Sequence, residues 1–169
     1  PEGYGSGNYE QIIAGCNETK KGIEENGLKV WSIHLPYGNS YDISTTDEEK
    51  RQRIVDELTV YIRALAEVYK PYAMVLHPSG EPITTGKDRS EYITQSAKSV
   101  SELAQVADEV GVVLCVENLP RTCLGSTPDE MLQIVSPTKS ARICFDTNHY
   151  LKGTHYEFLR KVGHLVATV

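Results

Sequence analysis

The stretch Ala141-Arg142-Ile143-Cys144-Phe145-Asp146-Thr147-Asn148-His149 joins a buried strand to a group of polar side chains. Positions 143–145 are an uninterrupted apolar run, which is typical of a strand that is buried on both faces. The run ends at the carboxylate of Asp146, and the imidazole of His149 follows three residues later. Such a strand directs Asp146 towards whatever lies beyond the end of the sheet. The alternative is that Asp146 only caps the turn over 147–150, because Asx turns are common.

The same arrangement, a short apolar run followed by a histidine or an acid, occurs three times upstream. These runs predict strands at 28–34, 72–76 and 112–116, and the side chains at their ends are His34, His77 and Glu117. A last apolar run lies at 164–169. Amphipathic stretches between the runs predict helices at 8–26, 46–69, 88–110, 127–135 and 154–162.

Alternating strands and helices, with strands that are apolar throughout, predict an α/β fold with a parallel sheet covered by helices. Successive strand ends lie 43, 40 and 29 residues apart, a loose fit to the roughly 31 residues that each unit of a (β/α)8 barrel occupies. We therefore expect residues 1–169 to form one domain, a partial TIM barrel of about five β/α units. A doubly wound open sheet is the alternative, but no glycine-rich phosphate loop follows any strand. His155 and His164 begin a helix and a strand, away from the strand ends, and we interpret both as structural.

Composition excludes several classes of protein. The 169 residues carry a formal net charge of -6, which gives no electrostatic reason to bind a nucleic acid. No apolar run approaches the ~20 residues that a membrane helix needs. The four cysteines include no CxxC pair, which disfavours a structural zinc or redox motif and is consistent with reduced thiols in the cytoplasm.

The four strand-end side chains are expected to meet on one face of the barrel. The carboxyl ends of all strands in such a barrel open on the same face, and adjacent strands lie only ~4.8 Å apart. Two imidazoles and two carboxylates suit a divalent ion such as Zn²⁺ or Mn²⁺, which removes the repulsion between the acids. The set is His34, His77, Glu117 and Asp146. Each histidine alone has the alternative role of a hydrogen-bonded structural residue, whereas an ionised Glu117 at the end of a buried strand needs a partner.

These strand ends and their neighbours resemble the xylose isomerase-like TIM-barrel superfamily. That superfamily includes sugar phosphate isomerases/epimerases and the endonuclease IV type of AP endonuclease. The resemblance runs from about residue 28 to residue 169, and the order and spacing of the motifs are more specific than each motif alone. The motifs are Ser32-Ile33-His34-Leu35-Pro36, Leu76-His77-Pro78, Val116-Glu117-Asn118-Leu119-Pro120 and Phe145-Asp146-Thr147-Asn148-His149.

The resemblance implies a divalent metal ion (Zn, Mn or Mg) bound by Glu117 and Asp146, with His77 as a further ligand. His34 and His77 are metal ligands in the endonuclease branch and line the substrate pocket in the sugar branch. His149 is a ligand in the first branch and a substrate contact in the second. The first strand and the last strands of the family barrel are missing from the sequence, together with two further ligands. We therefore expect about half of the site, and either self-association through two open sheet edges or a sequence cut from a longer chain.

The leading hypothesis is a metal-dependent isomerase or epimerase that acts on a small-molecule sugar or sugar phosphate. Glu117 takes the proton next to the substrate carbonyl, and His149 orients the substrate. Asn118 is expected to bind substrate, and Arg121 to meet a phosphate unless it is simply a solvated loop residue. The alternatives are a metal-dependent AP endonuclease like endonuclease IV, which the acidic net charge disfavours, and a non-catalytic relative that binds a sugar or a protein partner.

Overall fold

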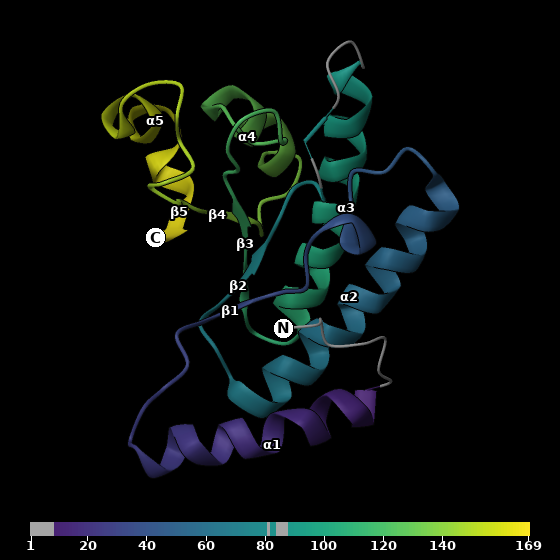
Figure 1. Ribbon diagram of the computed structural model, residues 1–169, viewed down its shortest axis with the longest axis vertical. Helices are drawn as coiled ribbons and strands as arrows, with labels where there is room; N and C mark the ends of the chain where they lie inside the picture. Colours follow the sequence, from purple (N-terminus) through teal and green to yellow (C-terminus); the bar gives the residue numbers. More distant parts are fainter. Residues whose placement is uncertain (1–8, 81, 84–87) are drawn as a thin grey trace.

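The computed structural model describes residues 9–80, 82–83 and 88–169. The expected start of the first helix at Asn8 and most of the polar loop over 81–87 lie outside the described residues. Five strands form one parallel sheet in the order β1-β2-β3-β4-β5, with helices packed along it (Figure 1). The strands are β1 (Ser32–His34), β2 (Ala73–Leu76), β3 (Val113–Glu117), β4 (Arg142–Cys144) and β5 (Val166–Thr168).

Sequential strand order confirms the predicted partial barrel. Every strand pairs in parallel with the next one along the chain, whereas a doubly wound sheet reverses direction at its middle. The doubly wound alternative is therefore wrong. The helices are α1 (Tyr9–Glu25), α2 (Glu48–Tyr69), α3 (Arg89–Glu109), α4 (Pro128–Val135) and α5 (His155–Val162), with short 3-10 helices η1 (Asn39–Tyr41) and η2 (Gly163–Leu165).

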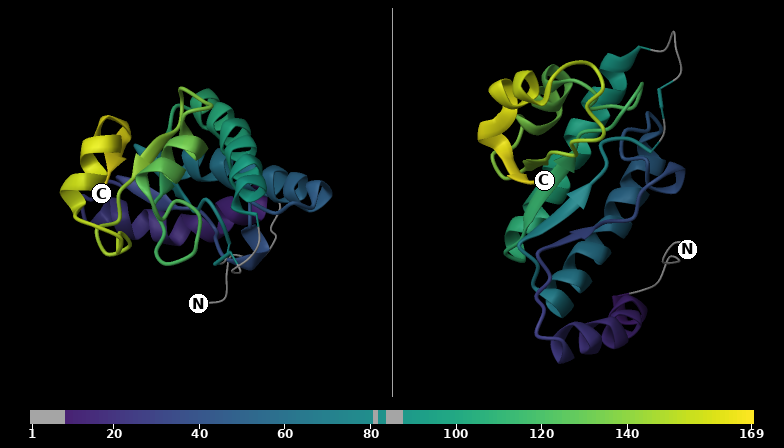
Figure 2. Two further views of the ribbon diagram at one scale, coloured as in Figure 1. Left: turned by 90° about the horizontal axis from the view of Figure 1, so that it is seen from above. Right: turned by 60° about the vertical axis from the view of Figure 1, so that its left-hand side comes forward.

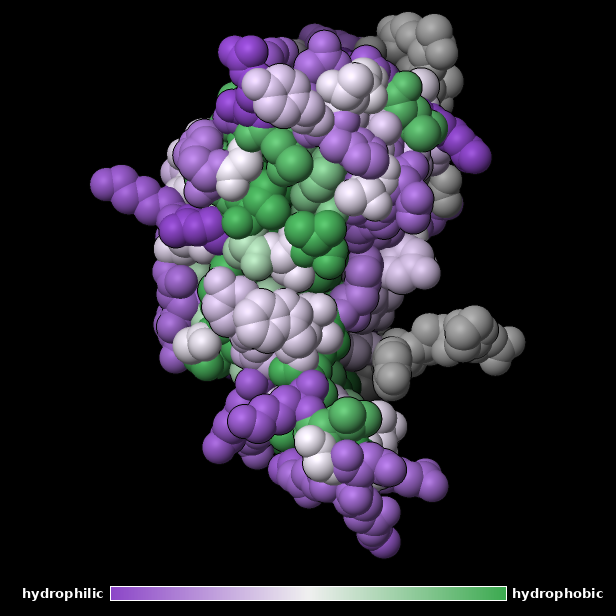
Figure 3. All heavy atoms as spheres, turned by 90° about the vertical axis from the view of Figure 1, so that its left-hand side faces the viewer, coloured by the Kyte–Doolittle hydropathy of each residue, from purple (hydrophilic) through white to green (hydrophobic). Residues whose placement is uncertain are grey.

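Along each strand, the side chains point alternately to the side of the sheet that faces the helices and to its inner side. Side chains such as Met74, Leu114 and Ile143 are fully buried in one core with apolar residues of the helices. The residues next to these in each strand face the inner side instead, because successive side chains of a strand point to opposite faces. They line a shallow cleft of about 360 Å³ that includes Val75 and Cys144. Figure 2 shows the helices along the outer side of the sheet. Seen from the side opposite α2 and α3, the surface carries a hydrophobic band between hydrophilic margins (Figure 3).

The two edge strands are shorter than the sequence predicted. We expected a strand from residue 28, but β1 begins at Ser32, and the last strand begins at Val166 after the 3-10 turn η2. Each edge strand pairs with a single described neighbour, so fewer backbone hydrogen bonds hold it extended. Before β1, the carbonyl of Trp31 accepts hydrogen bonds from the backbone N–H groups of Tyr72 and Ala73.

The cysteines are free thiols in the described chain. Burial raises the pKa of the Cys115 thiol to about 12, and likewise that of Cys144. Both thiols therefore stay protonated and unreactive at neutral pH. Among the described helices, none combines the length and the apolar composition that a membrane crossing requires.

Candidate metal centre

The strand ends bring the predicted side chains together. His34 is the last residue of β1 and Glu117 the last of β3, as expected. His77 follows β2 directly, and Asp146 lies two residues beyond the end of β4. Because the strands are parallel and in sequential order, all four lie at one edge of the sheet, the carboxyl edge where barrel enzymes build their sites.

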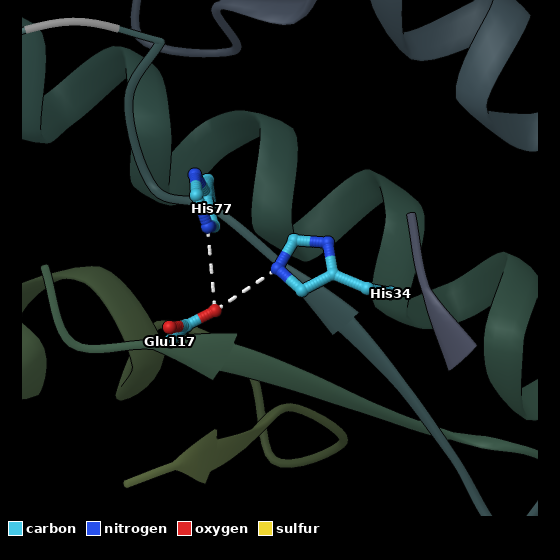
Figure 4. Close-up of side chains that lie close together, drawn as sticks. All are labelled: His34, His77 and Glu117. Carbon is cyan, nitrogen blue, oxygen red and sulfur yellow. Dashed lines mark hydrogen bonds and ion pairs between the residues drawn. The ribbon is translucent and has the colours of Figure 1, made fainter. Parts of the chain in front are cut away.

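Glu117 is the centre of this cluster. Its side chain is only 8% exposed, and its two carboxylate oxygens face different partners. Oε2 lies 3.0 Å from Nε2 of His34 and 3.3 Å from Nε2 of His77, so two strands direct an imidazole at the same atom (Figure 4). Oε1 lies 3.0 Å from Nδ1 of His149. One buried carboxylate is thus surrounded by three imidazoles.

These contacts set the charge of the cluster. Burial by itself would raise the pKa of Glu117, but the hydrogen bonds from His34 and His77 outweigh it and hold that pKa far below its ordinary value. Burial conversely would lower the pKa of His34, and the hydrogen bond to Glu117 raises it overall. Glu117 is therefore ionised at neutral pH and is stabilised by the hydrogen bonds at its Oε2 atom.

The orientation of His34 leaves one nitrogen directed into the site. Its Nδ1 donates to the backbone carbonyl of Leu35 at 2.8 Å, and a carbonyl oxygen can only accept. This bond fixes the ring so that Nε2 points at Glu117, where it can either donate a proton or offer a lone pair to a metal ion. A backbone partner on the far nitrogen is the usual arrangement of a metal-binding histidine.

His149 is oriented differently. Its Nδ1 lies 3.1 Å from the backbone carbonyl of Asn118 and 3.0 Å from Oε1 of Glu117, so this nitrogen carries a proton shared between two acceptors. Oδ2 of Asp146 lies further away, at 3.6 Å from the same nitrogen. The other ring nitrogen, Nε2, forms no hydrogen bond with the described residues. His149 therefore offers Nε2, rather than Nδ1, to a ligand.

The two carboxylate oxygens of Asp146 have different surroundings. Its Oδ1 accepts from the backbone N–H of Asn148 at 2.7 Å, which is the Asx turn that the sequence offered as the alternative role of Asp146. Its Oδ2 remains on the side of His149. The turn therefore fixes one carboxylate oxygen and leaves the other in the cluster.

Asn118 has a position that the sequence did not indicate. We expected a substrate contact, but its side chain is fully buried and spans from β3 to the end of β4. Its Nδ2 donates to the carbonyl of Asp146 at 3.0 Å, and its Oδ1 accepts from the backbone N–H of Asp146 at 2.8 Å. Both polar atoms are thus used internally, and Asn118 holds Asp146 in place. These hydrogen bonds give Asn118 a structural role, and its direct contact with a substrate stays a prediction.

Two other predicted positions lie outside the cluster. Arg121 is exposed in the loop after β3, in the left-handed backbone region with φ of 59°, and forms no ion pair with the described part of the chain. Its phosphate role stays a prediction. The ring of His155 packs edge-on against Phe145, and its Nε2 donates to the carbonyl of Thr147 at 2.9 Å. This is the structural role that its position suggested.

The side chains form two groups that fit a metal ion, and both include Glu117. One group is His34, His77 and Glu117, and the other is Glu117, Asp146 and His149; in each, the ligand atoms lie within 4.8 Å of one another. The expected ligand set of Glu117, Asp146 and His77 is thus divided between them. Two nitrogens and a carboxylate oxygen are ligands that Zn²⁺ accepts. The first group fits better. Its two histidines face Glu117 with Nε2, whereas His149 faces Glu117 with Nδ1, and the proton on that nitrogen already faces the carbonyl of Asn118.

The sequence analysis missed one aromatic neighbour of the first group. The ring of Tyr37 lies 5.0 Å from that of His34 and 4.7 Å from that of His77, between centroids, and most of its surface is exposed. Its position three residues after His34 was the available signal. A tyrosine in a Pro-Tyr-Gly turn is ordinarily a loop residue, so this position alone does not indicate a role at the site.

Comparison with known proteins agrees with the motif resemblance. A family model described as xylose isomerase-like TIM barrel matches residues 6–167. The uncharacterized protein MJ1311 of Methanocaldococcus jannaschii is 27% identical over 138 residues, which cover 79% of this chain and 46% of that protein. The probable endonuclease 4 of Bacillus cytotoxicus is 30% identical over 137 residues, which cover 77% of this chain and 43% of that protein. The chain spans less than half the length of these curated relatives.

Solved structures share the fold over almost the whole chain. A D-tagatose 3-epimerase-like protein superposes with a TM-score of 0.78 at 22% identity, covering 95% of this chain and 59% of that one. A 3-keto-D-glucoside 4-epimerase from E. coli gives a TM-score of 0.77 at 22% identity, covering 96% of this chain and 65% of that one. At these identities the likeness establishes the architecture, and the chemistry has to be argued from the residues.

Proposed function

Because this chain belongs to the xylose isomerase-like TIM barrel family, we propose that it carries part of the active site of a metal-dependent sugar or sugar-phosphate isomerase or epimerase. The observation that supports this proposal is the buried carboxylate of Glu117 with imidazoles on both of its oxygens. Structural neighbours named as sugar epimerases make this chemistry the first to consider.

His34, His77 and Glu117 are the residues that we assign to a divalent cation. Imidazole nitrogens favour Zn²⁺ or Mn²⁺ over Mg²⁺, which prefers oxygen ligands. A cation at this position supplies Lewis-acid polarisation of a substrate carbonyl. Nε2 of His34 would then offer its lone pair to the cation, since Nδ1 donates to the carbonyl of Leu35.

The protein's own groups then divide the remaining work. We assign to Glu117 the removal of the proton next to the carbonyl, since it is the ionised group at the centre of the cluster. His149 presents its Nε2 to a substrate hydroxyl, because its Nδ1 is held by the carbonyl of Asn118. Asp146 and Asn118 hold the segment that carries His149.

Metal content and isotope exchange test this proposal together. We expect near-stoichiometric Zn²⁺ or Mn²⁺ in the protein by elemental analysis, and its loss in Glu117→Gln. With ketose and aldose substrates in ²H₂O, the loaded protein should incorporate deuterium at the carbon next to the carbonyl, and Glu117→Gln should reduce the rate by about 10²–10⁴-fold. Glu91→Gln is the control, because this carboxylate is exposed on α3. A protein that takes up no metal after reloading would refute the proposal.

A second function has one specific observation in its favour. Glu117 belongs to both ligand groups, so it can act as a carboxylate shared by two ions, as in two-metal phosphodiester chemistry. A relative named probable endonuclease 4 points the same way. The net charge of -6 opposes it, because phosphate contacts on DNA need lysine and arginine. Strand cleavage at abasic sites without deuterium exchange would establish this second function. Sugar binding with neither activity would indicate a non-catalytic relative.

A further inference from the structure

The loops that follow β1 and β2 meet at Gly80, three residues after His77. The backbone N–H of Gly80 donates to Oδ1 of Asp42 at 3.0 Å. A Cβ added at Gly80 would lie 2.6 Å from the carbonyl oxygen of Gly38 and 2.7 Å from the Cβ of Asp42. Real Cβ atoms do not approach other atoms so closely, so this contact between the two backbones needs a glycine.

Asp42 is itself held in one orientation. The same Oδ1 accepts from the backbone N–H of Ser44 at 3.0 Å and from its hydroxyl at 2.6 Å, and Ser44 is completely buried. The neighbouring carbonyl of Ile43 accepts from the hydroxyl of Ser99 on α3 at 2.9 Å. The Asp42 carboxylate is therefore a fixed acceptor, positioned by its own loop and by α3, and not a mobile surface acid.

The loop of His77 has further anchors, which lie on other elements. The Ser96 hydroxyl of α3 donates to the carbonyl of Pro78 at 2.8 Å, and the hydroxyl of Ser79 accepts from the backbone N–H of Leu124 at 3.2 Å. Neither of these bonds reaches the loop that follows His34. Asp42 provides that link through a side chain.

This link lies three residues after His77, and the position of His77 relative to His34 is what a shared metal ion would require to be constant. The rings of His34 and His77 come from different strands, lie 4.7 Å apart between centroids, and direct Nε2 at one oxygen of Glu117. Two imidazoles at the ends of separate strands keep converging on one atom only if the loops that continue from those strands keep a fixed distance. A shift of about 0.5 Å is already enough to impair such a site.

We propose that Asp42 is a positioning residue of the metal centre, which holds the His77 loop against the His34 loop so that both imidazoles converge on Glu117. The inference rests on the proposed metal site. A carboxylate at this place acts through the Gly80 N–H group and does not touch the cation or the substrate.

Co²⁺ titration of the metal-free protein, followed by its visible spectrum, tests this role. We expect Asp42→Ala to weaken Co²⁺ binding by about 10–100-fold, the range known for partners that orient ligands, and to change the spectrum. Asp42→Asn should stay close to the wild type, since its amide oxygen still accepts from Gly80. Asp47→Ala is the matched control, because Asp47 accepts from the backbone of Lys50 at 3.0 Å and caps α2 without reaching Gly80.

Each outcome decides the question. Wild-type affinity and spectrum in Asp42→Ala would overturn the positioning role, and so would an equal loss in Asp47→Ala. Gly80→Ala serves if Asp42→Ala does not fold, because the added methyl group separates the same two loops; unchanged Co²⁺ affinity there also overturns the role. If the wild type binds no Co²⁺, the proposed function fails. The crystal structure of Asp42→Ala then decides this inference, which requires the His34 and His77 rings to move apart.

Discussion

The two oxygens of Glu117 face neighbourhoods that differ in construction. At Oε2, two histidines arrive from separate strands and both present Nε2, with the far nitrogen of His34 bound to a carbonyl. At Oε1, Asp146 and His149 come from one short loop, and Nδ1 of His149 faces a carbonyl as well as Glu117. On the first side the nitrogens that face Glu117 are both Nε2 atoms, whereas the second side is braced by backbone hydrogen bonds. The difference teaches that proximity to a carboxylate does not alone identify a candidate metal ligand: it also matters whether a backbone carbonyl binds the near or the far nitrogen of the imidazole.

Removing one histidine from each side gives the largest contrast. We expect His77→Ala to weaken Zn²⁺ or Co²⁺ binding by at least about 10–100-fold, because it deletes a nitrogen directed at Oε2. His149→Ala should leave metal affinity within about threefold and reduce turnover by about 10²-fold, since this ring is assigned to the substrate. Metal titration and steady-state kinetics on both variants check this. Equal losses of metal affinity would erase the distinction between the two sides.

The brace on the second side predicts a change in stability. Asn118→Ala removes two hydrogen bonds to the backbone of Asp146 and leaves the partner groups unsatisfied, at a cost of about 1–3 kcal/mol. Urea unfolding of the metal-free protein measures it. The control is Asn26→Ala, whose side chain makes an exposed hydrogen bond to the carbonyl of Gly22 near the end of α1. A loss no greater than that of the control would show that the brace is unimportant.

The smallest expected effect is the pH dependence of stability that the first side contributes without metal. The pKa of Glu117 is lowered on folding, so its contribution is present above the ordinary value of 4.5 and is lost as pH falls through its folded pKa. The pKa of His34 is raised, so its contribution is complete below 6.5 and is lost as pH rises through its folded pKa. The stability difference between wild type and Glu117→Gln should therefore be greatest between these two values. Unfolding free energies across pH with a chelator present measure it, and a difference that does not vary with pH would contradict the hydrogen-bonded pair.

Local patterns explain why much of the barrel was predictable. The run over 143–145 and the buried β2 are apolar because the middle strands have helices on one face and the interior of the barrel on the other, and this composition is visible in the sequence. His34 and Glu117 end their strands as expected. The lengths of β1 and β5 were overestimated, because an edge strand is limited by its pairing and not by its composition.

The roles of particular polar residues could not be predicted from the sequence. Asn118 stands beside Glu117 in the sequence, yet its amide is directed to the backbone of Asp146 on the next strand. Asp42 lies in a loop that gave no signal, because its partner is the N–H group of Gly80, 38 residues away. Such bonds depend on how two loops approach each other, which neither periodicity nor local turn chemistry encodes.

The sequence by itself determined the kind of fold and the residues available for chemistry at its carboxyl edge. Strand periodicity and apolar runs are local properties, and parallel strands in sequential order place their ends together. Tertiary structure decided which atoms of those residues contact one another. His34 and His77 face one oxygen of Glu117, His149 faces the other, and Asp42 joins the loops that follow β1 and β2. These contacts depend on which nitrogen or carboxylate oxygen is already hydrogen-bonded to a backbone group. Bonds between distant segments form only when those segments are packed together.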